Sequence, residues 1–565
     1  MIPKCSIKLV SSLEKCFLDE TIASKKERNR FLMYRNEKLS FQLLIHNDED
    51  DHKSPSHFRL SVEGALAPYV QLREMVCVPN HYPACPASYD DNYLRTAPGL
   101  YPDLLRPIHN GGYLRYPCGQ LRTVWVDVQI PEDAEVPTEE TALTFALSYE
   151  YGKDNTDEVI AKCDASVRVS PVKLPAQKLI HTEWFYTDTI AELYHTEVWS
   201  EKHWEMIEKY IKVAVDNGIN MILTPVFTPE LDTYVGGERL TTQLVKITVT
   251  GQDTYAFDFG LLDRWVDMCE RLGVKYFEIP HFFSQWGAKA APKFVAAVDG
   301  EERRIFGWET DSLGDEYRLF LAQFVPALVA YCKARGIDKR CYYHISDEPS
   351  LKHLEHYLAC KERVAPYLEG YAIIDALSSI EFYGKGVLKK PVPSIDHVVP
   401  FIEQKVEGLW TYYAGAGGAT VRTDRYLAMP TARTRILGVQ LYLHHIEGFL
   451  HWGYNCYHSC GSYDVVNPLG ATDGETWAPA GDSFLVYPGT DGTVWESIRL
   501  NAMREAMDDI RALELCESVL GRERTEELIS VGTTEPLTFF AYPKDSEYLL
   551  SLHDRVLLAI EESIQ

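Results

Sequence analysis

The regular alternation of short apolar segments with amphipathic helices between residues 180 and 451 most constrains the fold. Each apolar segment has the length and the β-branched and aromatic content of a buried strand. We count eight such strands, centred near Ile180, Ile222, Tyr276, Tyr343, Ile373, Val398, Trp410 and Leu450. Eight strands that alternate with helices predict an α/β architecture, the (β/α)8 TIM barrel, which carries its functional residues at the carboxyl ends of its strands.

The first 175 residues have another pattern. Short alternating strands separated by turn residues dominate, and helix signals are sparse, which is typical of a β-sandwich. Pro171 to Pro175 indicates a linker. We therefore expect an N-terminal all-β sandwich domain over residues 1–175 and the barrel domain, with C-terminal helices, over residues 176–565. Residues 237–259 predict a hairpin inserted into one barrel loop.

The composition restricts the partners of the chain. The formal net charge is −26 and the basic residues are not clustered, so we expect no nucleic acid partner. A chain with this negative charge repels acidic substrates, so neutral substrates fit it better. No apolar run approaches the length of a membrane span, and the N-terminus lacks an apolar signal core. The odd count of 13 cysteines, without framework spacing, favours free thiols in a reducing compartment. These features predict a cytoplasmic protein, and a homodimer is compatible with them.

The strand near Tyr343 ends in two adjacent carboxylates, Asp347 and Glu348. Pro349 follows, and the steric preference of the residue before a proline predicts an extended conformation for Glu348. Acids at the carboxyl end of a barrel strand are placed for catalysis. The alternative is that the two acids are a solvated strand exit or the N-cap of a helix that begins near Ser350.

Other predicted strand exits carry further acidic, aromatic, amide and imidazole groups. Carboxylates provide acid and base chemistry, and aromatic faces stack on sugar rings, so this set resembles a sugar site. For any single member the alternative is a structural residue at the barrel rim. The residues are Glu183, Trp184, Glu278, His281, Asp375, Trp410, Tyr412, Tyr413, His451, Trp452, Tyr454 and Asn455.

A metal site is the competing interpretation of one segment. His444, His445, His451, Cys456, His458 and Cys460 lie close in sequence, but HExxH and paired CxxC motifs are missing, so we predict no metal and no cofactor. The sequence also has no GxSxG elbow and no P-loop.

Three segments together resemble glycoside hydrolase family 123, the β-N-acetylgalactosaminidases. HISDEP at 344–349 resembles the catalytic strand of that family, GFLHWGYN at 448–455 its last barrel strand, and PAGDSFLVYPG at 479–489, followed by SIRL at 497–500, a block near its C-terminus. The resemblance covers residues 181–517, and the sandwich adds no motif of its own.

The resemblance implies a retaining exo-glycosidase that uses the 2-acetamido group of its own substrate as nucleophile. Asp347 would orient the acetamido N–H and stabilise the developing positive charge. Glu348 would protonate the leaving oxygen and then activate water. Because neighbouring carboxylates push their pKa values apart, we expect the raised pKa at Glu348.

Strand position suggests further sugar contacts. Tyr412 and Tyr413 are candidates for the acetamido carbonyl, and Trp452 for the floor of the sugar pocket. We expect His281, Trp410, Asn455 and Asp482 to contact hydroxyls. The expected partner is a small carbohydrate or glycoconjugate with a terminal β-linked N-acetylgalactosamine.

Three alternatives stay open at this point. The sugar can be β-N-acetylglucosamine or another hexosamine, because one polar side chain can read the 4-hydroxyl. A non-catalytic sugar-binding protein is the alternative of another class, although it does not explain an intact Asp347–Glu348 pair. A zinc hydrolase built on the His/Cys segment is the third.

Overall fold

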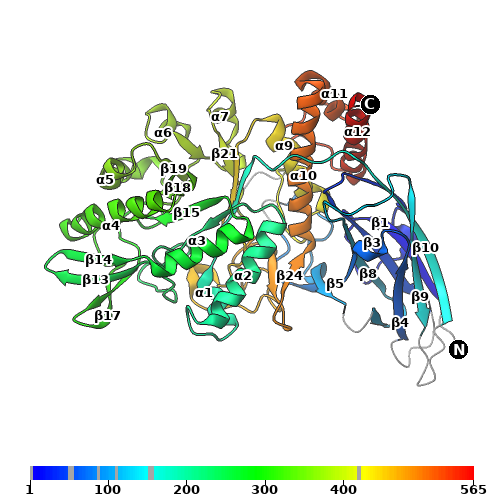
Figure 1. Cartoon of the computed structure of the whole chain (residues 1–565), viewed down its shortest axis with the longest axis horizontal. Coiled ribbons are helices and arrows are strands. Elements are labelled where there is room, and N and C mark those ends of the chain that lie inside the picture. Colours follow the sequence, from blue (N-terminus) through cyan, green and yellow to red (C-terminus); the bar gives the residue numbers. More distant parts are fainter. Residues whose placement is uncertain are drawn as a thin grey trace. The chain divides into compact units, whose positions relative to one another are not determined.

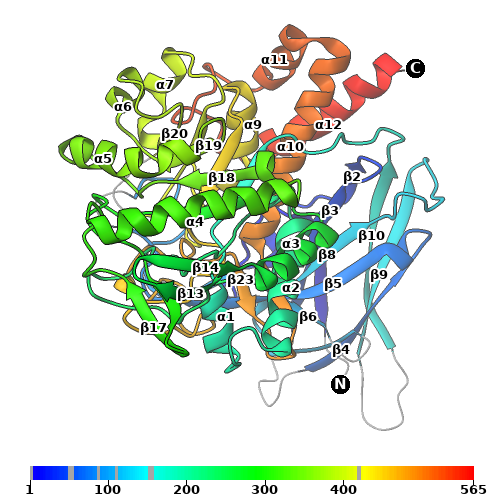
Figure 2. The same cartoon turned by 60° about the vertical axis from the view of Figure 1, so that its left-hand side comes forward.

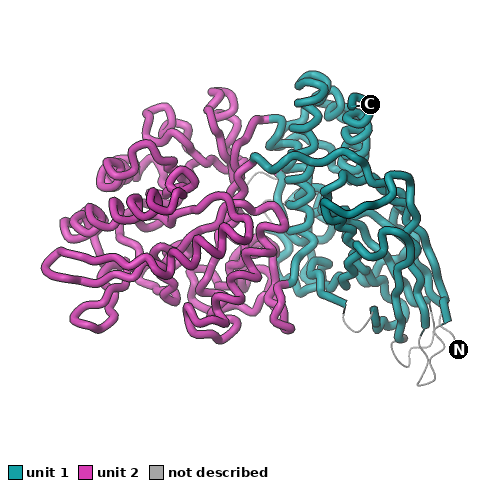
Figure 3. The backbone as a smooth tube through the Cα atoms, in the orientation of Figure 1, with its two compact units in different colours: residues 1–178, 423–443, 495–565 teal, residues 179–422, 444–494 magenta. Residues whose placement is uncertain are grey.

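The structure, a computed structural model, describes residues 4–48, 56–85, 89–108, 112–149, 158–415 and 421–564. The chain divides into two compact units, coloured separately in Figure 3. Unit 1 comprises residues 1–178, 423–443 and 495–565, and unit 2 comprises residues 179–422 and 444–494. Within the described ranges, none of the helices combines the length and the apolar character that a membrane crossing requires.

Unit 1 contains two β-sheets that share one apolar core (Figure 1). Phe41 and Val126 of one sheet and Phe58 and Phe145 of the other are fully buried in this core. The first sheet has the order β1 (Cys5–Ser11), β3 (Lys38–Asn47), β8 (Leu121–Gln129), β5 (Val70–Asn80), β6 (Gly99–Pro107) and β24 (Val494–Ser497). The second has the order β2 (Arg30–Met33), β10 (Glu158–Val169), β9 (Thr141–Tyr149), β4 (Ser56–Glu63) and β7 (Tyr113–Tyr116). The mostly-β character expected of the N-terminal region is confirmed.

Helices from the second half of the chain complete unit 1. They are α8 (Thr431–Arg435), α9 (Leu437–Leu443), α10 (Ile498–Leu520), α11 (Arg522–Ser530) and α12 (Ser546–Ile564). Their apolar faces form one buried cluster with Leu13, Tyr34 and Val172 of the N-terminal region. The compact units therefore run differently from the expected domains, because this cluster joins segments that are far apart in sequence. The boundary near residue 175 between two functional domains stays a prediction.

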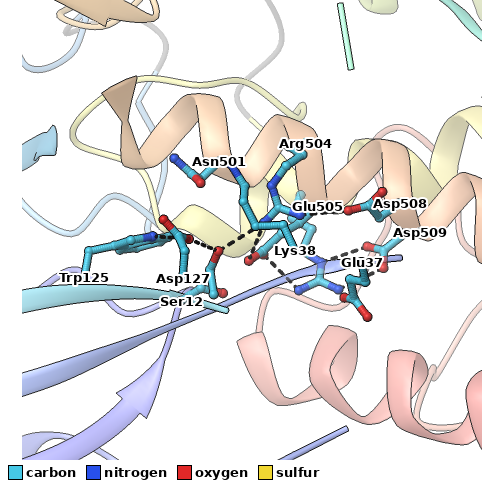
Figure 4. Close-up of polar contacts among 12 residues, drawn as sticks. Ser12, Glu37, Lys38, Trp125, Asp127, Asn501, Arg504, Glu505, Asp508 and Asp509 are labelled. Carbon is cyan, nitrogen blue, oxygen red and sulfur yellow. Dashed lines mark hydrogen bonds and ion pairs between the residues drawn. The ribbon is translucent and has the colours of Figure 1, made fainter. Parts of the chain in front are cut away.

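Charged side chains of α10 are also buried in unit 1 (Figure 4). Arg435 pairs with Asp509 (2.8 Å) and Glu505 (2.9 Å), and Arg504 donates to the hydroxyl of Ser40 (3.1 Å). Ser40 in turn donates to Asp127 (2.7 Å). These buried charges have hydrogen-bonded partners, as buried charges require. The network fixes α10 on the first sheet.

Unit 2 is built on a nearly closed barrel of eight parallel strands (Figures 1 and 2). In chain order the strands are β11 (Ile180–Glu183), β12 (Met221–Leu223), β15 (Tyr276–His281), β18 (Cys341–His344), β19 (Ala372–Ala376), β20 (Lys390–Val392), β21 (Trp410–Tyr412) and β22 (Gly448–His451). β22 pairs with both β11 and β21, and an isolated parallel bridge between Ser394 and Tyr412 connects the end of β20 to β21.

Helices follow most of these strands along the chain. They are α1 (Thr187–Leu193), α2 (Glu201–Asp216), α3 (Gly260–Leu272), α4 (Asp315–Ala334), α5 (Leu354–Val364), α6 (Ile380–Gly384) and α7 (Val399–Glu403). Gly273 ends α3 in the left-handed conformation (φ 99°) that its lack of a Cβ allows. The expected inserted hairpin is confirmed as β13 (Lys246–Gly251) and β14 (Thr254–Asp258), which join β16 (Phe294–Val298) and β17 (Glu301–Phe306) in a small sheet. The short strand β23 (Val486–Pro488) comes after the barrel.

One expected barrel strand is wrong. The segment around Val398 forms a 3-10 turn (Ile395–His397) and α7, and the sixth strand is β20, several residues earlier. Pro400 stands at the start of α7, where a missing N–H costs nothing. The apolar run was therefore a helix start and not a strand.

Candidate active site

The segment that carries Asp347 and Glu348 is fixed by the loop that follows β15. The N–H of Phe283 donates to the carbonyl of Ile345 (3.0 Å), and the N–H of Trp286 donates to the carbonyl of Asp347 (3.0 Å). The hydroxyl of Ser346 donates to the carbonyl of Ser284 (2.8 Å). Three consecutive residues before Glu348 are thus fixed by backbone contacts, which is the kind of rigid support a catalytic pair needs.

Glu348 is not extended, contrary to expectation. Its φ is +43°, in the left-handed region that non-glycine residues rarely adopt. The steric preference of a residue before proline is overcome here because Asp347 is held by Trp286 on one side and the chain must turn before Pro349. β18 itself ends at His344, so both acids lie on the loop beyond it. Strained residues of this kind cluster at functional sites.

The two acids differ in exposure. Asp347 is half-buried and Glu348 is exposed. Burial, followed by the charge of Glu348 and then that of Asp232, raises the pKa of Asp347 well above its usual range. The raised pKa that we expected at Glu348 stays a prediction.

Tyr412, at the end of β21, contacts the pair directly. Its hydroxyl donates a hydrogen bond to Oε1 of Glu348 (2.5 Å). A pocket of about 330 Å³ opens beside these two residues. Hydroxyl, imidazole and guanidinium groups line it, from Ser378, Ser394, His397 and Arg422. A hollow of this size and polarity can hold one neutral sugar ring.

Trp452 and Asp482 form a second group. The indole N–H of Trp452 donates to Oδ2 of Asp482 (3.2 Å), and the ring nitrogen Nε2 of His451 lies 3.2 Å from Oδ1 of the same carboxylate. The rings of Trp452 and Trp477 are 4.7 Å apart between centroids. Asp482 thus orients a half-buried indole, and Asp482 also acts electrostatically on Asp232, as Glu348 does.

The remaining predicted sugar contacts lie deeper. Tyr413 is fully buried, and its ring packs 5.1 Å from that of Phe449. Trp410 is 1% exposed, 5.4 Å from the ring of Tyr342 in the barrel interior. Asn455 bonds both backbone groups of Tyr186 (2.9 Å each). The contact of Tyr413 with the acetamido carbonyl, and those of Trp410 and Asn455 with sugar hydroxyls, stay predictions.

His281 is also buried, and it has open ring nitrogens. Its ring lies 4.2 Å from that of His344, centroid to centroid, and neither nitrogen has a hydrogen-bond partner among the described residues. Burial, followed by the positive charge of His344, lowers the pKa of His281 well below its usual range. A neutral imidazole with open nitrogens suits the hydroxyl contact expected of it.

Two of the acids at the strand exits serve a histidine. His344 lies between Glu278 (2.7 Å) and Asp375 (3.3 Å), and all three side chains are inaccessible to solvent. Burial alone would lower the pKa of His344, but its hydrogen bonds to Asp375 and Glu278 and their charges raise it to about 9. The imidazolium is therefore the counter-ion of two buried carboxylates.

Among the residues that the structure describes, two groups have ligand atoms close enough for a metal ion. In the first, His281, His344 and Asp375, the middle residue already has both ring nitrogens engaged by acids. In the second, Asp188, Glu192 and His458, the guanidinium of Arg239 bonds Asp188 (2.7 Å) and His458 (2.9 Å). Because these ligand atoms are already engaged in hydrogen bonds with other side chains, neither group favours a metal ion.

Sequence reasoning missed three residues that the structure connects to the acidic pair, Asp232, Gln285 and Trp286, and it missed Trp477, which packs against Trp452. Trp286 could have been suspected, because a tryptophan in a loop after a barrel strand is a common sugar platform, and it is 54% exposed. Asp232 follows no strand and has no motif, so the sequence holds no signal for it.

Comparisons with known proteins agree with this geometry. The family model described as "Glycoside hydrolase 123, catalytic domain" matches residues 184–516. A solved family 123 glycoside hydrolase from Clostridium perfringens, described in a study of glycolipid glycan hydrolysis, superposes with a TM-score of 0.74 at 15% identity, over 99% of this chain and 98% of that one. No curated protein matches the sequence.

Two further solved structures match about a third of the chain. The periplasmic chaperone SfaE has a TM-score of 0.16 at 10% identity and covers 31% of this chain and 66% of its own. Spo0M, a sporulation control protein from Bacillus subtilis, has a TM-score of 0.14 at 11% identity and covers 34% of this chain and 55% of its own. Neither likeness carries an argument about function.

Proposed function

The chain belongs to glycoside hydrolase family 123, and we propose that it releases terminal β-linked N-acetylgalactosamine with retention, by way of the 2-acetamido group of the substrate. That the chain is a glycosidase follows from the family. The specificity and the mechanism are our proposals, and the observation that carries them is the rigid Asp347–Glu348 pair with Tyr412 bonded to Glu348. We also propose that the nearly closed barrel, with its intervening helices, is a (β/α)8 barrel.

In the first step the acetamido carbonyl oxygen attacks the anomeric carbon while the bond to the leaving oxygen breaks. Glu348 gives its proton to that oxygen. The oxazolinium ion that forms carries a positive charge and an N–H, and Asp347 accepts the N–H. The negative charge of Glu348 is, after burial, the largest cause of the raised pKa of Asp347, so protonation of Glu348 favours the Asp347 carboxylate that accepts the N–H.

In the second step water attacks the anomeric carbon from the side that the leaving group vacated. Glu348 takes a proton from this water, and the oxazolinium ring opens to restore the acetamido group. Two inversions give net retention. The exposure of Glu348 fits this part, because both the leaving group and the water must reach it.

The exposed face of Trp286 supports a leaving group that is itself a sugar. The N–H of Trp286 donates to the carbonyl of Asp347, and the side chain is 54% exposed, so an aglycone can reach its indole ring. The family member from Clostridium perfringens is described in the context of glycolipid glycans, and a glycolipid glycan is the aglycone class that we propose here. A homodimer and a cytoplasmic location stay predictions.

The test is hydrolysis of p-nitrophenyl β-N-acetylgalactosaminide by the wild type, by Glu348→Gln and by the control Glu355→Gln, an exposed acid on α5, each with and without azide. We expect turnover by the wild type and the control, a large loss in Glu348→Gln, and partial recovery of that variant by azide. Faster turnover of the N-acetylglucosaminide would move the specificity to that sugar. No turnover of either glycoside would favour a sugar-binding protein.

A further inference from the structure

A third acidic residue, Asp232, belongs to the charge system of the catalytic pair. It lies on the long segment between β12 and β13, which no sequence motif marks. The charges of Glu348 and Asp482 act on Asp232, and the charge of Asp232 acts on Asp347. The mechanism above assigns this carboxylate no role.

The backbone of Asp232 is held by the same loop that holds Asp347. Oε1 of Gln285 accepts the N–H of Asp232 (2.8 Å), and Nε2 of Gln285 donates to the carbonyl of Thr233 (3.0 Å). Gln285 is buried, and its neighbour Trp286 bonds the carbonyl of Asp347 (3.0 Å). The hydroxyl of Ser462 donates to the carbonyl of Asp232 (3.0 Å). One loop therefore sets the position of both acids.

This support maintains a strained conformation. Asp232 has a φ of +58°, and Trp286 has a φ of +55°. Such values cost energy for residues with a side chain and persist where the surrounding contacts impose them. The hydrogen bond from Asp232 to Gln285, 53 residues away in sequence, maintains this backbone conformation. The conformation sets the direction of the Asp232 side chain, which indicates that this direction is functionally important.

The carboxylate itself keeps free hydrogen-bonding capacity. The hydroxyl of Tyr186 lies close enough to lower the pKa of Asp232, but it donates its proton to the carbonyl of Trp452 (2.9 Å). Arg239 is the nearest cation that acts on it, but Arg239 donates to Asp188 (2.7 Å), to the carbonyl of Leu231 (3.1 Å) and to His458. Among the residues that the structure describes, none forms an ion pair with Asp232.

The acids around this site are also spaced too widely for a cation. Three carboxylates that bind one metal ion bring their oxygens close together. Across the described ranges, Asp232, Asp347 and Glu348 are not among the groups whose ligand atoms all lie within 4.8 Å of one another.

We propose that Asp232 is a specificity-determining residue that accepts hydrogen bonds from hydroxyl groups of the terminal sugar, and that Gln285 is its positioning residue. The inference rests on the proposed function, since the sugar is the one that Asp347 and Glu348 attack. A hydroxyl-bearing neutral sugar gains two charge-assisted acceptor oxygens. A sugar that carries sulfate or carboxylate meets like charges from Asp232, Glu348 and Asp482, so the enzyme selects neutral hexosaminides and rejects anionic ones.

The experiment compares p-nitrophenyl β-N-acetylgalactosaminide with its 6-sulfate, using the wild type, Asp232→Asn and Gln285→Ala. The matched control is Asp253→Asn, because Asp253 has a similar left-handed φ (+52°) but lies exposed in the β13–β14 turn. Asn keeps the shape of Asp and tolerates this φ, and the melting temperature of each variant reports folding.

We expect kcat/KM of Asp232→Asn on the neutral glycoside to fall by about 10- to 100-fold, as the loss of hydrogen bonds to a charged group predicts. The preference for the neutral over the sulfated glycoside shrinks at least tenfold in the same variant, by the like-charge argument. Gln285→Ala changes both quantities in the same direction, and Asp253→Asn changes neither. A merely structural role for Asp232 would not alter the preference between the two substrates.

Calorimetric titration of free N-acetylgalactosamine and its 6-sulfate separates the two hypotheses. Turnover by the wild type with an unchanged preference in Asp232→Asn would overturn the inference and leave the proposed function standing. No turnover, but binding of the neutral sugar that Asp232→Asn weakens, would overturn the function and keep the inference. Binding of neither sugar would overturn both.

Discussion

The hydroxyl of Tyr412 donates a hydrogen bond of 2.5 Å to Oε1 of Glu348. The bond connects the end of β21 to the loop beyond β18, and it joins a buried phenol to an exposed carboxylate. Burial, followed by the charge of Glu348, raises the pKa of Tyr412 well above its usual range, so the phenol keeps its proton. Tyr412 therefore fixes the direction of Glu348, the acid that we propose protonates the leaving oxygen.

Replacing Tyr412 by Phe removes this bond and keeps the ring. We expect kcat/KM on the aryl N-acetylgalactosaminide to fall by about 10- to 100-fold, the value of one hydrogen bond to a charged group. The matched control is Tyr371→Phe, which removes a tyrosine–carboxylate bond to Asp338 (3.3 Å) at the opposite end of the strands. Equal activities of the two variants would show that the Tyr412 bond has no catalytic value.

Asp347→Asn tests the stabilisation of the oxazolinium ion. We expect a loss of about 10²- to 10⁴-fold in kcat/KM, because the amide cannot balance a developing positive charge. The rates of both proteins are measured on substrates whose acetamido group carries one, two or three fluorine atoms. Wild-type rates should fall steeply with fluorination, since the fluorines weaken the nucleophilic carbonyl oxygen. A flat series would contradict participation of the acetamido group.

The barrel could be predicted from sequence because each strand must be apolar and each helix amphipathic. The exception, β20, is three residues long and contains Pro391, so it has neither the length nor the composition of a recognisable strand. The apolar run around Val398 looked more like a strand than β20 does. Its identity depends on Pro400 at the start of α7, which composition alone does not reveal.

The site was predictable only where an acid follows a strand. This rule selected Asp347 and Glu348, the candidate catalytic pair, and it also selected Glu278 and Asp375, which are the buried counter-ions of His344. Sequence cannot distinguish these uses, because both need an acid at a strand exit. Asp232 could not be found, since its position depends on Gln285, which is 53 residues away.

The stability of the protein should also respond to Asp232. Burial, opposed by Arg239 and reinforced by Glu348 and Asp482, raises the pKa of Asp232 from 3.8 to about 6. The folded state therefore holds the proton more tightly than the unfolded state, so the stabilisation is complete below pH 3.8 and is lost as the pH rises through 6. The loss corresponds to at most about 3 kcal/mol.

Asp232→Asn should leave the melting temperature unchanged at pH 4 and raise it at pH 7.5, because the amide is neutral at both values. Thermal melts at the two pH values, with Asp253→Asn as control, measure this difference. A lower melting temperature of Asp232→Asn at pH 7.5 would mean that the carboxylate stabilises the fold, which would contradict this prediction.

His344 makes a contribution of the same sign, but over a higher pH range. Its folded pKa of about 9 lies above the ordinary value of 6.5, so its stabilisation is complete below pH 6.5 and is lost as the pH rises through 9. His344→Gln leaves Glu278 and Asp375 buried without a counter-ion, which should lower the free energy of unfolding by about 3–5 kcal/mol at pH 6.5.

Urea unfolding at pH 6.5, 8 and 9.5 measures both the pH dependence and the loss of stability in the variant, with the exposed His195→Gln as control. The wild type and the control should lose stability across this range while His344→Gln changes little. Parallel pH profiles of all three proteins would place the titration elsewhere in the chain.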